Sequence, residues 1–230
     1  MSKPGRASAT RIGSRWQRAR RPEHKLERRE AILEAAVAVL DDAGVEGATL
    51  SAIARKAGIS KANCYRYYES REAILLAVAL EECARWTDEI VSGLAALAGS
   101  GDRDAAAEVF VRATTARPRL CRLVSSLSSV LETNVGPGAV VDAKRGFHRL
   151  LIRSVVALCA SLPDLSLEAG RDFTTLFTFL VAAAWPAAHP TPVVAEVLAR
   201  GEFADMRVDF AATIRTQARA TLRGLAAGPA

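Results

Sequence analysis

The chain has 230 residues, of which 50% are apolar and only 6% are aromatic, and its net charge is +6. This length predicts one or two domains with a sizeable hydrophobic core. The composition favours a soluble helical protein rich in Ala and Leu.

Membrane and secretory segments are not expected. The longest apolar run, 176–188, is interrupted by Thr178 and Pro186, and it is shorter than the about 20 residues that a transmembrane helix needs. No apolar run follows the charges of the N-terminus, as it would in a secretory signal. We therefore expect a cytoplasmic protein without a membrane partner.

The cysteines and histidines predict no metal centre. Four cysteines are widely spaced without any CxxC pair, and the three histidines are scattered, which argues against a zinc site and a disulfide framework. We expect reduced thiols and no cofactor. The cysteines are Cys64, Cys83, Cys121 and Cys159.

Positive charge is concentrated at the N-terminus. Residues 1–29 carry ten Lys or Arg against Glu23 and Glu27, a net charge of +8, so that the rest of the chain sums to −2. Residues 1–24 are rich in Arg, Ser, Gly and Pro without a period, which predicts a disordered arm. Such an arm is either a solvated tail or a nucleic-acid contact. Five arginines could follow a DNA backbone or enter a minor groove: Arg11, Arg15, Arg18, Arg20 and Arg21.

The next elements are predicted as a helix over 25–43, ended by Gly44, and a second helix that begins after Thr49. A Thr hydroxyl at this position can cap the helix by accepting a bond from a backbone N–H. The second helix buries one face at helical spacing, through Leu50, Ile53, Ala54 and Ala57.

A tight turn and a third helix follow. Gly58 stands where a positive φ angle ends the second helix, and Ser60 can cap the third. The third helix presents Lys61, Asn63 and Arg66 outward, with Tyr65 and Tyr67 nearby. The spacing predicts a helix-turn-helix that enters a DNA major groove.

Only helices are expected beyond this point, because no segment alternates with period two. The fold class is therefore all-α, with a three-helix DNA-binding domain at 25–72, after the arm at 1–24, and a helical domain at 73–230. The expected helices cover about 70–97, 102–117, 118–132, 139–161, 167–185, 193–199 and 203–225.

Residues 28–78 resemble the TetR family of bacterial one-component regulators. The resemblance rests on Ala31-Ile32-Leu33-Glu34-Ala35-Ala36, Gly44, Thr49-Leu50-Ser51-Ala52-Ile53-Ala54, Ala57-Gly58-Ile59-Ser60 and the run from Tyr65 to Leu75. Cys64 stands where the family usually has an aliphatic residue, and Tyr68 where Phe is usual. The resemblance implies a homodimeric transcriptional regulator, usually a repressor, with an N-terminal domain for operator DNA and a larger domain for dimerisation and a small inducer.

Lys61 and Asn63 are the candidates for base contacts, because Lys can donate to guanine and Asn can pair with adenine. By resemblance, Thr49, Tyr65, Tyr67 and Arg71 are phosphate-contacting or docking positions, which fix register without reading sequence. The candidate DNA-binding residues outside the arm are Thr49, Ser60, Lys61, Asn63, Tyr65, Arg66, Tyr67 and Arg71.

The effector site is the least determined part of the sequence. Aromatic and aliphatic residues at helical spacing are more often core than ligand wall, and few buried charges are evident, which favours a hydrophobic small-molecule effector. The candidates are Phe110, Leu123, Leu127, Phe147, Leu151, Phe177 and Trp185. Helices 167–185 and 203–225 are expected to form a four-helix bundle in a homodimer, with two reading helices about 34–36 Å apart on a near-palindromic operator.

Three other functions stay open. The chain could be an activator or an inducer-independent regulator, an architectural DNA binder that relies on its arm, or a helical enzyme with an appended DNA reader. We do not expect an enzyme, because no nucleophile with an adjacent base, metal cluster or phosphate-binding glycine loop is found.

Overall fold

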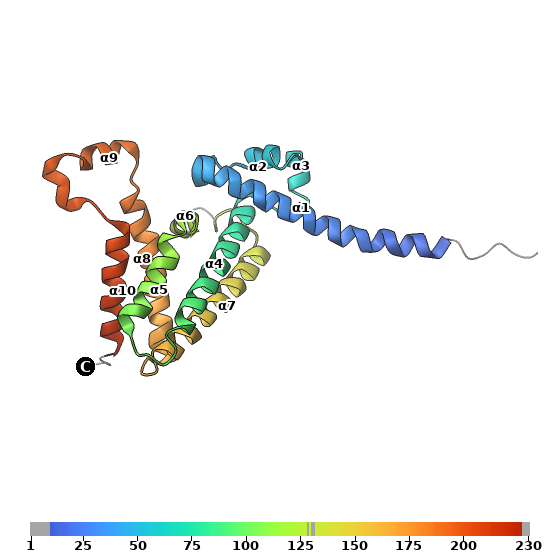
Figure 1. Cartoon of the computed structure of the whole chain (residues 1–230). Helices are drawn as coiled ribbons and strands as arrows, with labels where there is room; N and C mark the ends of the chain where they lie inside the picture. Colours follow the sequence, from blue (N-terminus) through green and yellow to red (C-terminus); the bar gives the residue numbers. More distant parts are fainter. Residues whose placement is uncertain (1–9, 128, 130–131, 227–230) are drawn as a thin grey trace, which may run out of the picture. The chain divides into compact units, whose positions relative to one another are not determined.

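The structure, a computed structural model, describes residues 10–127, 129 and 132–226, and side chains from His24 onward. All regular elements within these residues are helical, as the sequence predicts. The chain divides into two compact units with the boundary between Ile74 and Leu75, where the sequence predicts it after residue 72. Each unit is described separately below (Figure 1).

The first unit contains α1 (Thr10–Gly47), α2 (Leu50–Lys56), α3 (Lys61–Cys64) and the first turn of α4 (Arg71–Ala95). The helical backbone of α1 is interrupted at Gly44, where φ is 70° and ψ is −175°. This is the conformation that glycine adopts without strain from a Cβ atom, so the predicted helix end at Gly44 is confirmed.

The start of α1 differs from the sequence prediction. Residues 10–24, which we expect to be disordered, are helical from Thr10 onward, and residues 1–9 lie outside the described part of the chain. Arg, Gln and Ala in this stretch are good helix formers. Extending an existing helix needs no new nucleation step. The packed C-terminal half of α1 can therefore extend toward the N-terminus by adding residues one at a time.

The core of the first unit joins the inner faces of its helices. Ile32 and Leu40 of α1 and Ile53 of α2 are fully buried. Cys64 is also fully buried and fills the place of an aliphatic side chain. Tyr68 is 6% exposed, and the guanidinium of Arg29 lies 4.4 Å from the centre of its ring, a cation–π contact.

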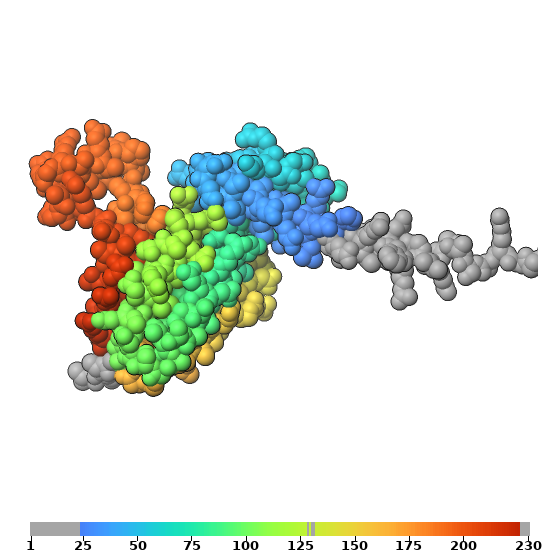
Figure 2. All heavy atoms as spheres, viewed as in Figure 1, coloured from blue at the N-terminus to red at the C-terminus, as the bar shows by residue number. Residues whose placement is uncertain are grey.

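The second unit is a helical bundle in which α8 packs against α6, α7 and α10, and α10 also packs against α5. Figure 2 shows α5 and α10 meeting on one face of this unit. Besides the rest of α4, its elements are α5 (Arg103–Thr115), α6 (Pro118–Ser125), α7 (Pro137–Ser161), α8 (Leu167–Ala188), α9 (Pro192–Leu198), the 3₁₀ helix η2 (Gly201–Met206) and α10 (Phe210–Ala226).

An aromatic cluster forms the centre of this unit. The ring of Phe110 meets those of Phe173, Phe177 and Trp86 edge to face, with centroids 5.0, 5.5 and 5.9 Å apart. Burying each such side chain contributes about 1.5–3 kcal/mol, and the ring geometry adds about 0.5–1.5 kcal/mol per pair. Helices far apart in the sequence are thereby held together.

A glycine allows α7 to approach α4 closely. A Cβ atom at Gly146 would lie 2.7 Å from the Leu80 side chain. The close approach brings the inner faces of α4 and α7 into one wall.

Several helix ends differ from the prediction. α8 continues through Pro186 to Ala188, although we expect it to end at Trp185. A proline lacks the backbone N–H and therefore removes one hydrogen bond of the helix. In the last turn of α8 only a few helical residues follow Pro186, so little of the helix is affected. α6 ends at Ser125 rather than near residue 132, and α7 starts at Pro137 rather than at about residue 139.

The predicted helix over 203–225 is two elements. Residues Gly201–Met206 form η2, and α10 begins at Phe210 because the Asp209 carboxylate accepts a bond from Ala212 N at 2.9 Å and caps it. The Arg207 guanidinium donates to the carbonyls of Leu198 and Ala199, which ties α9 to the segment after η2.

Candidate nucleic-acid interface and effector cavity

The helix-turn-helix geometry follows from local contacts. Thr49 Oγ1 accepts a hydrogen bond from Ala52 N at 3.2 Å, and Ser60 Oγ accepts one from Asn63 N at 3.2 Å. Gly58 has φ of 67°. Both predicted caps and the predicted positive φ are therefore confirmed, and together they fix where α2 ends and α3 begins.

The outer face of α3 and the segment that follows it carry the predicted contact residues. Lys61, Asn63 and Arg66 are exposed, and the Tyr65 side chain is 54% exposed, so Tyr65 is not a core residue. Cys64 faces inward on the same helix. This division leaves a cation, an amide and a phenol free to meet base edges or phosphates.

Arg29 fastens the segment after α3 to α1. Its guanidinium Nη1 donates to the Tyr67 carbonyl at 2.9 Å while the same group lies over the Tyr68 ring. The backbone that carries Tyr65, Arg66 and Tyr67 is thereby held at a fixed distance from α1, which positions a reading surface.

Arg71 has contacts within the first unit. Its Nη1 donates to the Glu46 carbonyl at 3.4 Å, its Nε lies 3.2 Å from the Glu72 carboxylate, and its side chain is 22% exposed. The guanidinium that we expect to face DNA is thus also used to hold the end of α1 against the start of α4.

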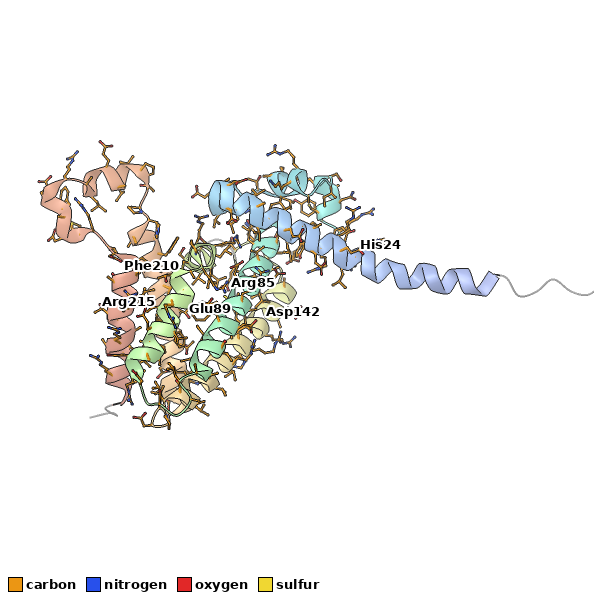
Figure 3. All side chains as sticks on the ribbon, in the orientation of Figure 1. His24, Arg85, Glu89, Asp142, Phe210 and Arg215 are labelled. Atoms are coloured by element: carbon orange, nitrogen blue, oxygen red, sulfur yellow. The ribbon has the colours of Figure 1, made fainter. Side chains whose placement is uncertain are left out.

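A basic groove lies between α1 and the segment after α3. His24, Lys25 and Arg28 line one side of the groove, and Arg66 and Tyr67 line the other. Figure 3 labels His24 at this place. The three α1 residues are absent from the sequence prediction, although the i, i+3 spacing of Lys25 and Arg28 places them on one helix face. The arm arginines lie where no side chain is described.

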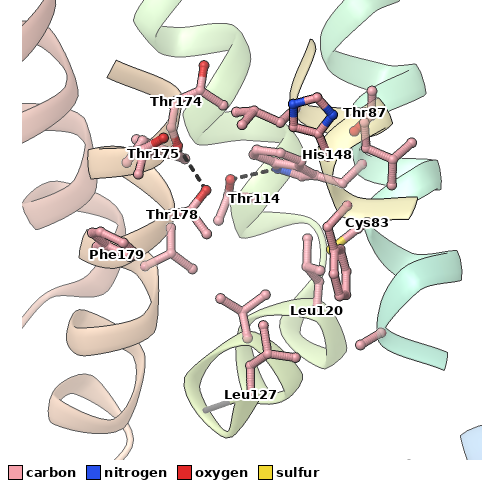
Figure 4. A pocket seen from close by; sticks show the side chains of 18 of the residues that line it. Cys83, Thr87, Thr114, Leu120, Leu127, His148, Thr174, Thr175, Thr178 and Phe179 are labelled. Atoms are coloured by element: carbon pink, nitrogen blue, oxygen red, sulfur yellow. Dashed lines mark hydrogen bonds between the residues drawn. The ribbon is translucent and has the colours of Figure 1, made fainter. Parts of the chain in front are cut away.

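The second unit contains a partly open cavity of about 490 Å³ (Figure 4). This volume lies within the about 300–1,000 Å³ that is usual for pockets of small molecules. Side chains of α4, α5, α6, α7 and α8 form its wall, and most of them are apolar.

The structure sorts the seven predicted pocket residues into wall and core. Leu127, Phe147, Leu151 and Phe177 line the cavity. Phe110 and Leu123 are fully buried in the core and do not line it. Trp185 stacks on His189, with centroids 3.7 Å apart, and meets Phe210 edge to face.

Threonines form the polar part of the wall, and none of them is among the pocket residues predicted from the sequence. Thr114, Thr174 and Thr178 donate their hydroxyls to the carbonyls of Phe110, Gly170 and Thr174 at 2.7–2.9 Å. Thr87 and Thr175 complete the set. The spacing 174, 175, 178 places three hydroxyls on one face of α8, and this is the signal that could have found them.

Among the described residues, charge near the cavity lies at its rim and in a buried cluster. Lys144 is exposed and pairs with Glu132 at 2.6 Å, and exposed His148 follows one turn later on α7. The Glu82 carboxylate is 4% exposed and accepts bonds from Arg85 and Arg119, each at 2.8 Å. The prediction of few buried charges misses this cluster.

The thiols are all free. Cys64 and Cys121 are buried, and Cys83 lines the cavity. Burial, followed by the nearby Glu82 charge, raises the pKa of Cys83 to about 12, so this thiol stays protonated near neutral pH. Among the described residues, no group of three or more His, Cys, Asp or Glu could hold a metal ion. No helix in the described part of the chain is long and apolar enough to cross a membrane.

The sequence matches two descriptions of one family. Residues 32–78 match "Bacterial regulatory proteins, tetR family", and residues 80–229 match "Tetracyclin repressor-like, C-terminal domain". A 76-residue stretch is 36% identical to the HTH-type transcriptional regulator BetI of Rhizobium meliloti (strain 1021). That stretch covers 33% of this chain and 37% of the BetI chain.

Solved structures share the fold. The fatty acid degradation regulator FadR of Bacillus halodurans has a TM-score of 0.56 and 17% identity, over 86% of this chain and 95% of that one. The FadR of Thermus thermophilus, a TetR family transcriptional repressor solved in complex with lauroyl-CoA, has a TM-score of 0.56 and 21% identity. That match covers 85% of this chain and 94% of the Thermus chain.

Proposed function

Since the chain belongs to the TetR family of bacterial regulatory proteins, we propose that it is a sequence-specific DNA-binding transcriptional regulator. Its most favoured role is that of a ligand-responsive repressor that binds a near-palindromic operator as a homodimer. The observation that carries this proposal is the capped helix-turn-helix, with Lys61 and Asn63 exposed on its third helix and Arg66 exposed in the segment just after it. It acts in the cytoplasm, where the DNA lies, and catalyses no reaction.

The contacts with DNA divide into two kinds. Lys61 and Asn63 donate to base edges in the major groove and supply discrimination. Phosphate contacts come from Thr49, Ser60, Tyr65, Arg66, Tyr67 and Arg71, from the α1 residues of the basic groove, and from the arm arginines Arg11, Arg15, Arg18, Arg20 and Arg21. The first unit is otherwise acidic, so the arm at 1–24 and the groove provide the general attraction to DNA.

The homodimer is proposed to form through α8 and α10. These helices pack on each other within one chain, and α8 exposes Leu176, Phe179 and Ala183, which recur at i, i+3 and i+7 along one stripe. The exposed fractions are 52% for Leu176 and 65% for Phe179. Water-exposed apolar side chains in such a row are buried when two copies form a four-helix bundle.

Release from DNA is proposed to start in the cavity. Phe179 lines the cavity and also lies on the exposed stripe of α8. A ligand that fills the cavity therefore changes the packing of a residue that contacts the partner copy. We propose two dimer geometries, of which only one matches the half-site spacing of the operator. The ligand binds the other geometry more tightly and so shifts the dimer away from the form that binds DNA.

The proposal is tested by selecting binding sites from random duplex DNA with the full chain. We expect near-palindromic sites whose half-sites lie about one helical turn, 10–10.5 base pairs, apart. DNase I footprints on the selected duplexes then give the length of the site. Recovery of sequences without any preference, or a footprint that spreads along the DNA, would replace the regulator with an architectural binder.

A further inference from the structure

Thr87 of α4 has a buried hydroxyl that finds no partner among the residues that the structure describes. Its side chain is 1% exposed and lines the cavity, and its Oγ1 has no hydrogen-bond partner among the described residues. Figure 4 shows Thr87 among the side chains of the cavity wall. A buried hydroxyl that makes no hydrogen bond has lost its hydration by water, and this raises the free energy of the folded protein. A ligand that forms a hydrogen bond with the hydroxyl would recover part of this cost.

The other buried hydroxyl side chains among the described residues of the unit lack this property. Thr114, Thr174, Ser154 and Ser161 each donate to a carbonyl of their own helix. Helical Ser and Thr commonly satisfy themselves in this way. Thr87 also lies in an α-helix, but its hydroxyl makes no such bond. This distinguishes Thr87 from the threonines whose hydroxyls are already paired within their own helix.

The cavity around Thr87 is unsuited to a charged ligand. Its charged wall residue, Lys144, is exposed at the rim and already neutralised by Glu132. The remaining wall is apolar apart from threonines, the neutral Cys83 thiol and the exposed His148. A carboxylate or ammonium moved from water into this cavity meets no buried counter-charge among the described wall residues, and its desolvation is not offset.

Covalent capture of an electrophile by Cys83 is also disfavoured. The thiolate is the nucleophilic form of cysteine, and burial holds the pKa of Cys83 at about 12. A ligand in this cavity is therefore held without a covalent bond.

We propose that the effector is a neutral, mainly apolar molecule with one carbonyl or hydroxyl group that pairs with the Thr87 hydroxyl. This inference rests on the proposed function, since it names the chemical class that the regulatory cavity takes. Thr87 belongs to the cavity wall, so its hydroxyl is within the reach of a ligand there and can donate to a ligand oxygen. Thr87 is the residue that selects between an oxygenated ligand and a hydrocarbon of the same shape.

The test uses two neutral probes of one shape, fluorenone and fluorene, which differ by a carbonyl oxygen. Their binding to the full chain is measured by displacement of Nile red, a neutral apolar dye. The wild-type protein should prefer fluorenone by about twofold to tenfold, the value of one net hydrogen bond. Fluorene-9-carboxylate, which adds a charge, should bind more weakly than fluorenone.

Two valine variants separate pairing from packing. Thr87→Val keeps the shape of the side chain and should abolish the preference for fluorenone, leaving fluorene binding unchanged. Thr174→Val makes the same change in the same wall, at a hydroxyl that already donates to Gly170, and should keep the preference. Circular dichroism melts confirm that both variants are folded.

Three results overturn the assignment of Thr87: no measurable binding of fluorenone to the wild-type protein, an equal effect of the two valine variants, or tightest binding of the carboxylate. The selection of DNA sites is made on the same protein preparations. A protein that selects no DNA sequence but shows the Thr87-dependent preference refutes the regulator and keeps the cavity chemistry. The opposite pattern refutes only the cavity chemistry.

Discussion

The indole Nε1–H of Trp86 donates a hydrogen bond to Thr114 Oγ1 at 3.0 Å, and Thr114 donates in turn to the Phe110 carbonyl. The pair joins α4 to α5 beside the cavity. Thr87 follows Trp86 in the chain, yet its own hydroxyl has no such partner among the described residues. Trp86 and Thr87 are thus neighbours in α4 and both line the cavity. The polar group of Trp86 is paired, whereas that of Thr87 is unpaired among the described residues.

Thr114→Val is expected to destabilise the protein, because it leaves the partly buried Trp86 N–H without an acceptor. The cost of an unpaired buried group is about 1–3 kcal/mol, which lowers Tm by several degrees in a chain of this size. Thermal melts followed by circular dichroism measure it. Thr87→Val breaks no bond and serves as the matched control, with an unchanged or higher Tm. Equal losses of Tm in both variants would show that the Trp86–Thr114 bond contributes nothing.

Glu108 is expected to stabilise the protein in a pH-dependent manner. The Arg215 guanidinium donates to both Glu108 oxygens, at 2.9 and 3.2 Å, and these bonds, together with nearby arginine charges, lower the pKa of Glu108. Figure 3 labels Arg215 on α10. Because the folded pKa is depressed, the contribution is full above the unfolded value, about 4.3, and is lost as pH falls through the folded pKa.

Glu108→Gln should therefore lower Tm by about 1–4 °C at pH 7, as expected for a partly exposed ion pair of about 0.5–1 kcal/mol. The difference from the wild-type protein should shrink as the pH is lowered from 5 toward 3. Asp142→Asn is the control, since its pair with Arg145 spans 3.7 Å on an exposed surface. A gap between wild type and Glu108→Gln that stays constant with pH would contradict the linkage.

Asn63→Ala is expected to lower discrimination between operator and mismatched DNA. A good bidentate base contact is worth about 1–3 kcal/mol, so affinity for the selected site should fall by about tenfold or more while non-specific affinity stays the same. Competition binding on matched and mismatched duplexes measures the ratio. Ala62→Ser, at an exposed position beside Asn63 on the same helix, is the control. Full sequence preference in Asn63→Ala removes this residue from base readout.

The double variant Lys25→Ala, Arg28→Ala is expected to weaken binding to all DNA alike. Each phosphate contact that is lost reduces the slope of log K against log salt by about 1. Titrations of the selected site at several salt concentrations measure this slope. Lys56→Ala, at an exposed residue of α2 outside the groove, should leave the slope unchanged. The same slope in the double variant and the wild type would show that the groove does not face DNA.

Phe179→Glu is expected to dissociate the homodimer. The side chain is 65% exposed in one chain, so the substitution is tolerated by the monomer, whereas a buried carboxylate on each side of a two-fold interface is strongly unfavourable. Sedimentation velocity should give a folded monomer. Val193→Glu, at a 73% exposed residue of α9 outside the stripe, tests the specificity of this effect. A stable Phe179→Glu dimer places the interface elsewhere.

Contacts between near neighbours in the chain were predictable from the sequence. The caps at Thr49 and Ser60 and the positive φ angles at Gly44 and Gly58 each involve groups within about four residues. Capping and backbone sterics depend on such short separations, so residue type and order suffice. The outward position of Lys61 and Asn63 follows from the same periodicity.

The cavity wall depended on tertiary structure. Phe110 and Leu127 are equally apolar in the sequence, yet Phe110 is core and Leu127 is wall. The packing of α4, α5, α7 and α8 decides which of the two side chains lines the cavity. Helical periodicity in the sequence shows only which side of a helix is buried. Gly146 illustrates this, because its effect is visible only beside Leu80.

By itself, then, the sequence determined an all-α chain with a helix-turn-helix of defined ends, because those features are set by local hydrogen bonds and backbone angles. The tertiary structure decided that α1 and Arg66 share a basic groove and that the Thr87 hydroxyl, in the wall of a cavity, has no partner within the described part of the chain. Both depend on side chains brought together from distant parts of the chain, and whether a buried hydroxyl is paired is decided only when every neighbouring helix is in place.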